Sequence, residues 1–252
     1  MHRYHSPAAR FSNRALMTHA QAGLPQTLGL RPRAAADQPA EILLYDEIGL
    51  WGTTAKDFIQ TLAQAGDGDI VVRINSPGGD VFDGLAMFAA LQAHAGNVSV
   101  IVDGIAASAA SFIALAGASV AMAENAFLMI HNAWGVVVGN RNDMTETASV
   151  LSKIDGQLAS LYAQKTGQTA EAMGQLMDTE TWFTAQEAKD AGFVDSIISG
   201  GESAKASLRP GVFNRIPPAL AASSQATTLT DLAASLASRR RLIQLAEAEN
   251  AA

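Results

Sequence analysis

The chain has 252 residues, a net charge of −7 and no cysteine. This length suffices for one full α/β core with tails, and leaves too little for a second large domain. The acidic balance gives no general attraction to nucleic acid or to an anionic membrane surface, so we expect neither as a partner. The lack of cysteine excludes disulfides and a thiol nucleophile, so any covalent catalysis must use a hydroxyl, an amine or a carboxylate.

Composition divides the chain into three parts. Residues 1–38 have the features of a flexible basic segment, residues 39–200 those of a folded domain, and residues 201–252 those of a linker with an accessory C-terminal helix. The stretch 98–123 has Asp103 as its only acidic or basic side chain, and hydropathy alone would allow it to be a membrane span. Its glycines and serines divide it into a strand and a helix, so we expect a buried βα unit and no membrane span.

Short apolar runs typical of strands alternate with helical spacings through the central part. We expect strands at 42–45, 70–74, 98–102, 127–130 and 193–198. We expect helices near 58–62, 81–88, 112–115, 142–165, 170–177 and 185–191. Such alternation predicts an α/β fold with a largely parallel, helix-covered sheet. Sites in such sheets lie beyond the carboxyl ends of the strands, which is where chemistry is to be sought.

Three motifs follow predicted strands. Residues 75–80 (NSPGGD) combine a proline with paired glycines, so the backbone can turn sharply and present N–H groups to an oxyanion, or form an ordinary tight turn. Residues 103–109 (DGIAASA) place Ser108 at the start of a helix, where it can act as a nucleophile or merely cap the helix. His131 follows the strand 127–130 and suits either a general base or a packed structural residue.

Ser111 is the alternative nucleophile, because it lies one helical turn beyond Ser108 among similarly small residues. We prefer Ser108 because it is closer to the turn, whereas Ser111 is expected inside the helix. The remaining histidines suit catalysis less, because they are expected in a tail or on a helix surface. They are His2, His5, His19 and His94.

Taken together, the motifs closely resemble those of the ClpP family, the proteolytic subunits of Clp proteases. Residues 75–79 are similar to its oxyanion motif, residues 104–108 to its nucleophile motif and residues 129–131 to its base motif. The resemblance implies the ClpP/crotonase-like fold of repeated β-β-α units with a helix-covered sheet. Residues 45–49 and 180–183 look most like the phage and prophage branch of head maturation proteases, which implies, by analogy, capsid-protein processing.

The resemblance also implies the roles of individual residues. Ser108 would be the nucleophile and His131 its base, with the N–H groups of Gly79 and Ala109 as oxyanion donors and no metal or cofactor. The chain would then be a serine endopeptidase that cleaves polypeptides through an acyl-enzyme. A homo-oligomeric ring, an ATP-dependent unfoldase partner and a cytoplasmic location follow from the same resemblance. We expect hydrolysis to fall in acid as His131 protonates near a pKa of about 6.5.

The third triad position departs from the family pattern. Thr181 stands where the family usually has its carboxylate, and Asp178 and Glu180 are nearby alternatives, so the third member stays open. In an extended strand, residues 178 and 180 would share a face and Thr181 would point the other way. We therefore expect the Glu180 charge to matter more than the Thr181 hydroxyl.

Two other functions remain open. One is a catalytically inactive ring or scaffold subunit that keeps the fold, and the other is a crotonase-like acyl-CoA enzyme. The paired serine and histidine favour an active peptidase over both, because acyl-CoA chemistry of that kind does not call for such a pair.

Overall fold

The computed structural model describes residues 28–31, 38–199, 213, 215–217 and 220. Within this part of the chain, eight strands form one sheet: β1 (Leu28–Arg31), β2 (Ala40–Leu44), β3 (Ile70–Ser76), β4 (Val98–Ala107), β5 (Ser119–Ala123), β6 (Phe127–Ile130), β7 (Thr181–Thr184) and β8 (Ser196–Ile198). The same residues form the helices α1 (Ala55–Ala65), α2 (Val81–Gln92), α3 (Ala109–Ala114), α4 (Arg141–Thr166), α5 (Ala170–Asp178) and α6 (Ala185–Asp190).

The sheet is mainly parallel and forks at its centre. Strands β2, β3, β4, β5 and β8 pair in that order, all parallel, and β1 adds to the β2 edge in the antiparallel direction. The long strand β4 pairs with β5 along its first half and with β6 along its second half. Strand β7 lies antiparallel to β6. The fork therefore brings the carboxyl ends of β4 and β6 side by side, both running the same way.

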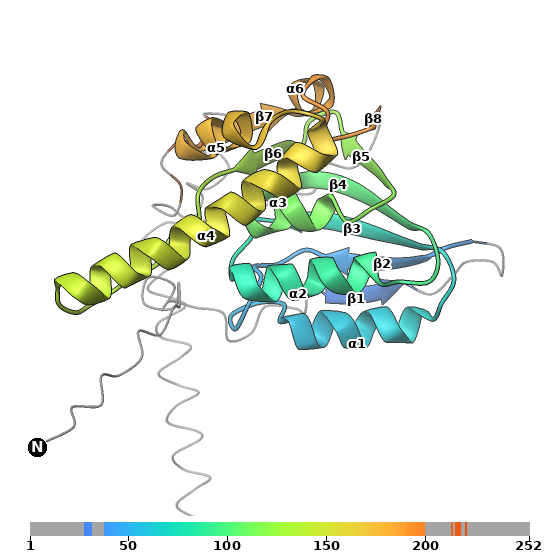
Figure 1. The fold of residues 1–252 in the computed structure, drawn as a ribbon. Helices are drawn as coiled ribbons and strands as arrows, with labels where there is room; N and C mark the ends of the chain where they lie inside the picture. The colour runs from blue at the N-terminus through green and yellow to red at the C-terminus, as the bar shows by residue number, and fades with distance from the viewer. Residues whose placement is uncertain (1–27, 32–37, 200–212, 214, 218–219, 221–252) are drawn as a thin grey trace, which may run out of the picture. The chain divides into compact units, whose positions relative to one another are not determined.

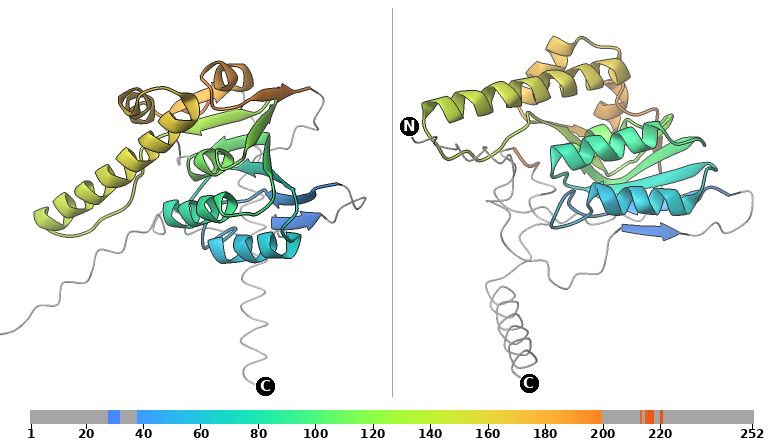
Figure 2. Two further views of the ribbon diagram at one scale, coloured as in Figure 1. Left: turned by 45° about the vertical axis from the view of Figure 1, so that its right-hand side comes forward. Right: turned by 60° about the horizontal axis from the view of Figure 1, so that its bottom comes forward.

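Helices α1, α2 and α3 cover one face of this sheet (Figures 1 and 2). Their contact residues are fully buried, as Phe58 of α1, Met87 of α2 and Phe112 of α3 show. Alternate residues of β2 face them, with Ile42 and Leu44 completely shielded from solvent. Each such side chain stabilises the fold by about 1.5–3 kcal/mol through burial. This packing gives the central strands a rigid frame from which site residues can project.

Helix α4 has clear sequence signals at both ends. Asn140 caps its first turn in a capping box with Asp143, and Gly167 ends it in the left-handed conformation at φ 72°. The N-terminal half of α4 extends beyond the sheet, whereas the C-terminal half crosses over α3 (Figures 1 and 2). The buried residues Leu158 and Tyr162 on that half join α4 to the core.

Some elements differ from those expected. Strands β5 and β7 were not predicted. Strand β5 is rich in alanine and serine, which favour strands weakly, whereas all four residues of β7 are of strand-favouring types and gave a signal that was short but present. Residues 28–31, expected in the flexible segment, instead form β1, because the exposed edge of β2 supplies its ladder. The accessory helix and residues 1–27 lie outside the described residues.

The apolar stretch 98–123 forms β4, α3 and β5, as a βα unit rather than one long helix. More generally, none of the helices in the described ranges has both the length and the hydropathy needed to cross a membrane.

Candidate active site

The two predicted catalytic residues lie at adjacent strand ends. Ser108 directly follows β4, and His131 directly follows β6. The strands are in register with Ala107 beside Met129, and the Ser108 N–H donates a hydrogen bond of 2.9 Å to the Met129 carbonyl. The Nε2 atom of His131 lies 2.7 Å from the Oγ atom of Ser108. Parallel pairing of β4 and β6 thus brings together two residues that are 23 positions apart in the sequence.

The backbone at Ser108 turns sharply. Its dihedral angles are φ 53° and ψ −125°, and a positive φ is rare for a residue with a side chain. Such a conformation costs on the order of 1–3 kcal/mol and persists where the surroundings enforce it. Ser108 precedes the first residue of α3, but its side chain makes no capping hydrogen bond. The hydroxyl is directed to His131, which disfavours the interpretation of Ser108 as a simple helix cap.

Ser111 lies in a different environment. Its side chain is completely buried in α3, and its Oγ donates a hydrogen bond of 2.6 Å to the Ser108 carbonyl. The same Oγ is 2.7 Å from the Tyr162 hydroxyl. Because both hydrogen bonds hold the Ser111 hydroxyl inside the fold, it is less available for attack on a substrate than the Ser108 hydroxyl.

The glycine turn after β3 packs directly against the Ser108 turn. Gly78 has φ 87°, and a Cβ atom there would lie 2.4 Å from the Ala107 carbonyl oxygen and 2.7 Å from the Ser108 Cβ. At Gly79, with φ 149°, a Cβ would lie 2.0 Å from the Ile48 carbonyl oxygen. Both positions therefore require glycine. The close approach places the backbone of Gly79 on the wall of the cavity that Ser108 and His131 also line.

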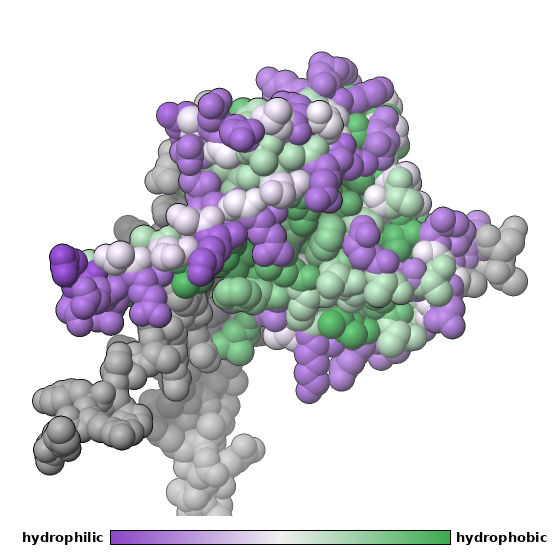
Figure 3. Space-filling view, viewed as in Figure 1, coloured by the Kyte–Doolittle hydropathy of each residue, from purple (hydrophilic) through white to green (hydrophobic). Residues whose placement is uncertain are grey.

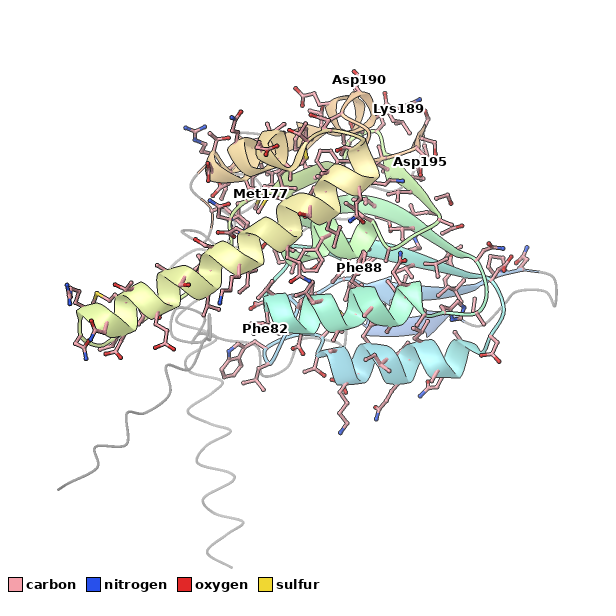
Figure 4. All side chains as sticks on the ribbon, viewed as in Figure 1. Phe82, Phe88, Met177, Lys189, Asp190 and Asp195 are labelled. Carbon is pink, nitrogen blue, oxygen red and sulfur yellow. The ribbon has the colours of Figure 1, made fainter. Side chains whose placement is uncertain are left out.

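The cavity beside Ser108 has one polar edge and otherwise apolar walls. Asp80, Ser108 and His131 form the polar edge with the backbone of Gly79 and Ala109. Helices α2, α3 and α4 and the residues after β6 supply the apolar walls, with Phe82, Phe112, Trp134, Leu151, Ile154 and Leu158. Phe82 lies at the N-terminal end of α2 (Figure 4). The space-filling view shows hydrophobic surface between α2 and α4 (Figure 3). The site can therefore hold an apolar group next to a hydroxyl and an imidazole.

Two opposing influences act on the imidazole of His131. Burial lowers its pKa below the ordinary 6.5, and the negative charge of Glu180 partly offsets this by favouring the protonated ring. The net pKa is lowered, so we now expect the acid limb of hydrolysis to lie below the value of about 6.5 expected from the sequence. A neutral imidazole at near-neutral pH is the form that can accept a proton from the Ser108 hydroxyl.

The segment 178–181 is not an extended strand, contrary to expectation. Asp178 ends α5, Glu180 has a positive φ of 49°, and β7 begins only at Thr181. The alternation of faces assumed between residues 178 and 181 therefore does not apply, because the chain must reverse direction between α5 and β7. The burial and partners of each side chain decide which one can act on His131.

The three candidates for the residue that orients His131 differ in their burial and in their hydrogen-bond partners. Asp178 accepts a hydrogen bond of 2.7 Å from the Asn132 side-chain amide at the surface. The Thr181 hydroxyl donates to the Leu176 carbonyl at 2.6 Å. Glu180 is 7% exposed, and its Oε1 lies 3.3 Å from the indole nitrogen of Trp182. Among these three, only the Glu180 charge acts on the His131 pKa.

Sequence reasoning missed the contribution of α4 to the site. The sequence predicts a helix at 142–165, but it does not show that Leu151, Leu158 and Tyr162 on one face of this helix line the cavity. One signal was present: a tyrosine in a buried stripe needs a hydrogen-bond partner for its hydroxyl, which pointed to a polar group beneath it.

A serine and a histidine in hydrogen-bond contact beside a glycine turn, on a parallel helix-covered sheet, form an arrangement similar to that of α/β serine hydrolases. The model of the family described as Clp protease matches residues 31–201, well over half of the chain. The chain therefore belongs to the Clp protease family, with the fold expected for it. Proteolytic subunits of this family are peptidases, which favours that activity over acyl-CoA chemistry.

Individual relatives agree with this assignment. The chain is 34% identical over 194 residues to ATP-dependent Clp protease proteolytic subunit 2 of Rhodococcus jostii, covering 73% of this chain and 95% of the relative. It is 32% identical over 167 residues to the proteolytic subunit of Bacteroides fragilis, covering 62% of this chain and 81% of the relative. The solved structure of a ClpP1 mutant from Listeria monocytogenes matches with a TM-score of 0.57 at 28% identity, over 64% of this chain and 91% of that one.

Proposed function

We propose that the chain is an active serine endopeptidase with Ser108 as nucleophile and His131 as general base. The observation that carries this proposal is the 2.7 Å contact between the Ser108 hydroxyl and the His131 Nε2 at a strained strand-to-helix turn. An inactive scaffold subunit would have no reason to keep a costly backbone conformation that directs a hydroxyl to a partly buried imidazole.

The proposed reaction has two steps. His131 takes the Ser108 proton as Oγ attacks a peptide carbonyl, and then gives that proton to the leaving amine, so that an acyl-enzyme forms. Water, deprotonated by the same imidazole, hydrolyses the ester. The N–H groups of Gly79 and Ala109, at the polar edge of the cavity, would stabilise the oxyanion, each by a factor on the order of 10²–10³.

Labelling with a fluorophosphonate tests this proposal. The probe should attach to the Ser108 Oγ, because the neutral imidazole beside it can accept its proton. Peptide mapping by mass spectrometry should find the modification on Ser108 and none on Ser111, whose hydroxyl is buried and engaged in the core. Labelling confined to Ser111, or no labelling of an assembled sample, would overturn the proposal.

We further propose a homo-oligomeric ring that encloses the active sites, with an ATP-dependent unfoldase as partner and a cytoplasmic location, by analogy with the family. Exposed apolar side chains support burial against other subunits: Val138 is 94% exposed, and Phe82 and Met144 are each about half exposed. Multi-angle light scattering at micromolar concentration should give a mass several times that of the 26.3 kDa chain. A purely monomeric sample at near-neutral pH would contradict ring assembly.

A narrower proposal concerns the substrate. Residues 45–49 and 180–183 resemble the phage and prophage branch, which supports a capsid protein as the natural substrate. Incubation of the active enzyme with a phage capsid precursor should release a defined fragment, and failure to cleave a panel of such precursors, with peptide hydrolysis intact, would count against it.

A further inference from the structure

A chain of three polar groups connects helix α4 to the turn that carries Ser108. The Tyr162 hydroxyl lies 2.7 Å from the Ser111 Oγ, which donates a hydrogen bond of 2.6 Å to the carbonyl oxygen of Ser108. Ser111 is completely buried and Tyr162 is 1% exposed, so water does not compete for these hydrogen bonds. The reaction proposed above uses neither hydroxyl.

The direction of this chain follows from its donors and acceptors. A carbonyl oxygen can only accept, so the single proton of the Ser111 hydroxyl points to Ser108. The Ser111 Oγ must then accept from Tyr162, whose hydroxyl is the donor. Burial raises the pKa of Tyr162 above its ordinary value, so the phenol keeps this proton at any working pH. The result is one directed chain from α4 to the Ser108 carbonyl.

The anchored carbonyl shares a peptide plane with a proposed oxyanion donor. The Ser108 oxygen accepts two hydrogen bonds from Ser111, one from its hydroxyl and one of 2.9 Å from its backbone N–H. In a planar trans peptide, the carbonyl and the following N–H point in opposite directions. Fixing the Ser108 oxygen from the core side therefore directs the Ala109 N–H away from the core, on the side where Ala109 borders the cavity.

We infer that Tyr162 and Ser111 are positioning residues that orient the Ala109 N–H for the oxyanion and hold the Ser108 turn in its strained conformation. This inference rests on the proposed function. The Tyr162 ring is itself held by Phe193, with ring centroids 5.9 Å apart in an edge arrangement of 72°. A rigid donor on α4 thus opposes rotation of a peptide whose backbone would otherwise relax from its positive φ.

The test is a double-mutant cycle of Tyr162→Phe and Ser111→Ala, each made in the full chain. Tyr162→Phe should lower kcat on a short peptide by about tenfold, a part of the 10²–10³ that one oxyanion donor contributes, and should leave KM nearly unchanged. Affinity for a peptide aldehyde, whose adduct with Ser108 carries the oxyanion, should fall by a similar factor. Because both variants break one chain, the double variant should be no slower than Ser111→Ala alone.

Thr147→Val is the matched control. Thr147 is a buried α4 residue whose hydroxyl donates to the Asp143 carbonyl at 2.8 Å, so this variant removes one buried hydrogen bond of the same helix away from the cavity. It should keep the wild-type kcat and aldehyde affinity. Additive effects in the cycle, or a Tyr162→Phe enzyme with wild-type kcat, would overturn the inference while fluorophosphonate labelling of wild-type Ser108 still supports the peptidase. An unlabelled wild type would overturn both.

Discussion

Replacing His131 with alanine should lower kcat/KM for peptide hydrolysis by a factor on the order of 10⁴–10⁶, because the Ser108 hydroxyl would lose the base that accepts its proton at 2.7 Å. A hydroxyl without such a base is a weak nucleophile at neutral pH. Residues that act as one unit are not additive, so adding Ser108→Ala to the His131 variant should cause little further loss. Steady-state hydrolysis of a fluorogenic peptide, with assembly checked for each variant, measures both effects.

His94→Ala serves as the control for this substitution. His94 follows α2, and its Nε2 lies 2.8 Å from the Gly68 carbonyl oxygen, in a contact that does not involve the cavity. The variant should retain nearly full activity. A His131→Ala enzyme as active as the His94 variant would remove His131 from the mechanism.

The pH profile of the wild-type enzyme follows from the same residue. Burial lowers the His131 pKa, so the acid limb of kcat/KM should have its midpoint below pH 6.5. The sign follows from the reacting form: the neutral imidazole is active, and activity is lost as pH falls through the lowered pKa. A midpoint at or above 6.5 would show that the Glu180 charge outweighs burial in the assembled protein.

The sequence was most informative where a motif carries its own geometry. The paired glycines at 78 and 79 predict a sharp turn after a strand, and both have a positive φ. The sequence places Ser108 at the start of a helix, and the backbone there also has a positive φ. The pairing of β4 with β6 that joins Ser108 to His131 was not readable from local patterns, because it depends on the fork created by the unpredicted strand β5. The order of the motifs identified Ser108 and His131 through a family resemblance. Their contact depends on tertiary structure.

The region after α5 was the least predictable. The path of the backbone there depends on Glu180, which adopts a left-handed conformation that is rare for a residue with a side chain. A pattern of alternating faces could not anticipate that reversal. The downward shift of the His131 pKa was not predictable for a related reason, because it comes from burial, which depends on tertiary structure and not on the neighbouring sequence.

Glu180→Gln should reduce turnover by about 10²–10⁴-fold, because it removes the charge that stabilises the imidazolium of His131 while nearly preserving shape. Glu180 is buried, with its Oε1 near the Trp182 indole, and its charge favours protonation of His131. Removing that charge lowers the His131 pKa further, so the acid limb of kcat/KM should also move to lower pH.

Thr181→Ala and Asp178→Asn are the matched comparisons. The Thr181 hydroxyl donates to the Leu176 carbonyl, and the Asp178 carboxylate accepts from Asn132, so both side chains have partners away from the imidazole. Neither change should shift the acid limb, and both should cost less turnover than Glu180→Gln. If Thr181→Ala is instead the more damaging change, the carboxylate does not orient the base. A serine and histidine pair supported by a hydroxyl then becomes the correct description. The acid limb of kcat/KM is the second readout, because loss of a charge shifts it and loss of local structure alone does not.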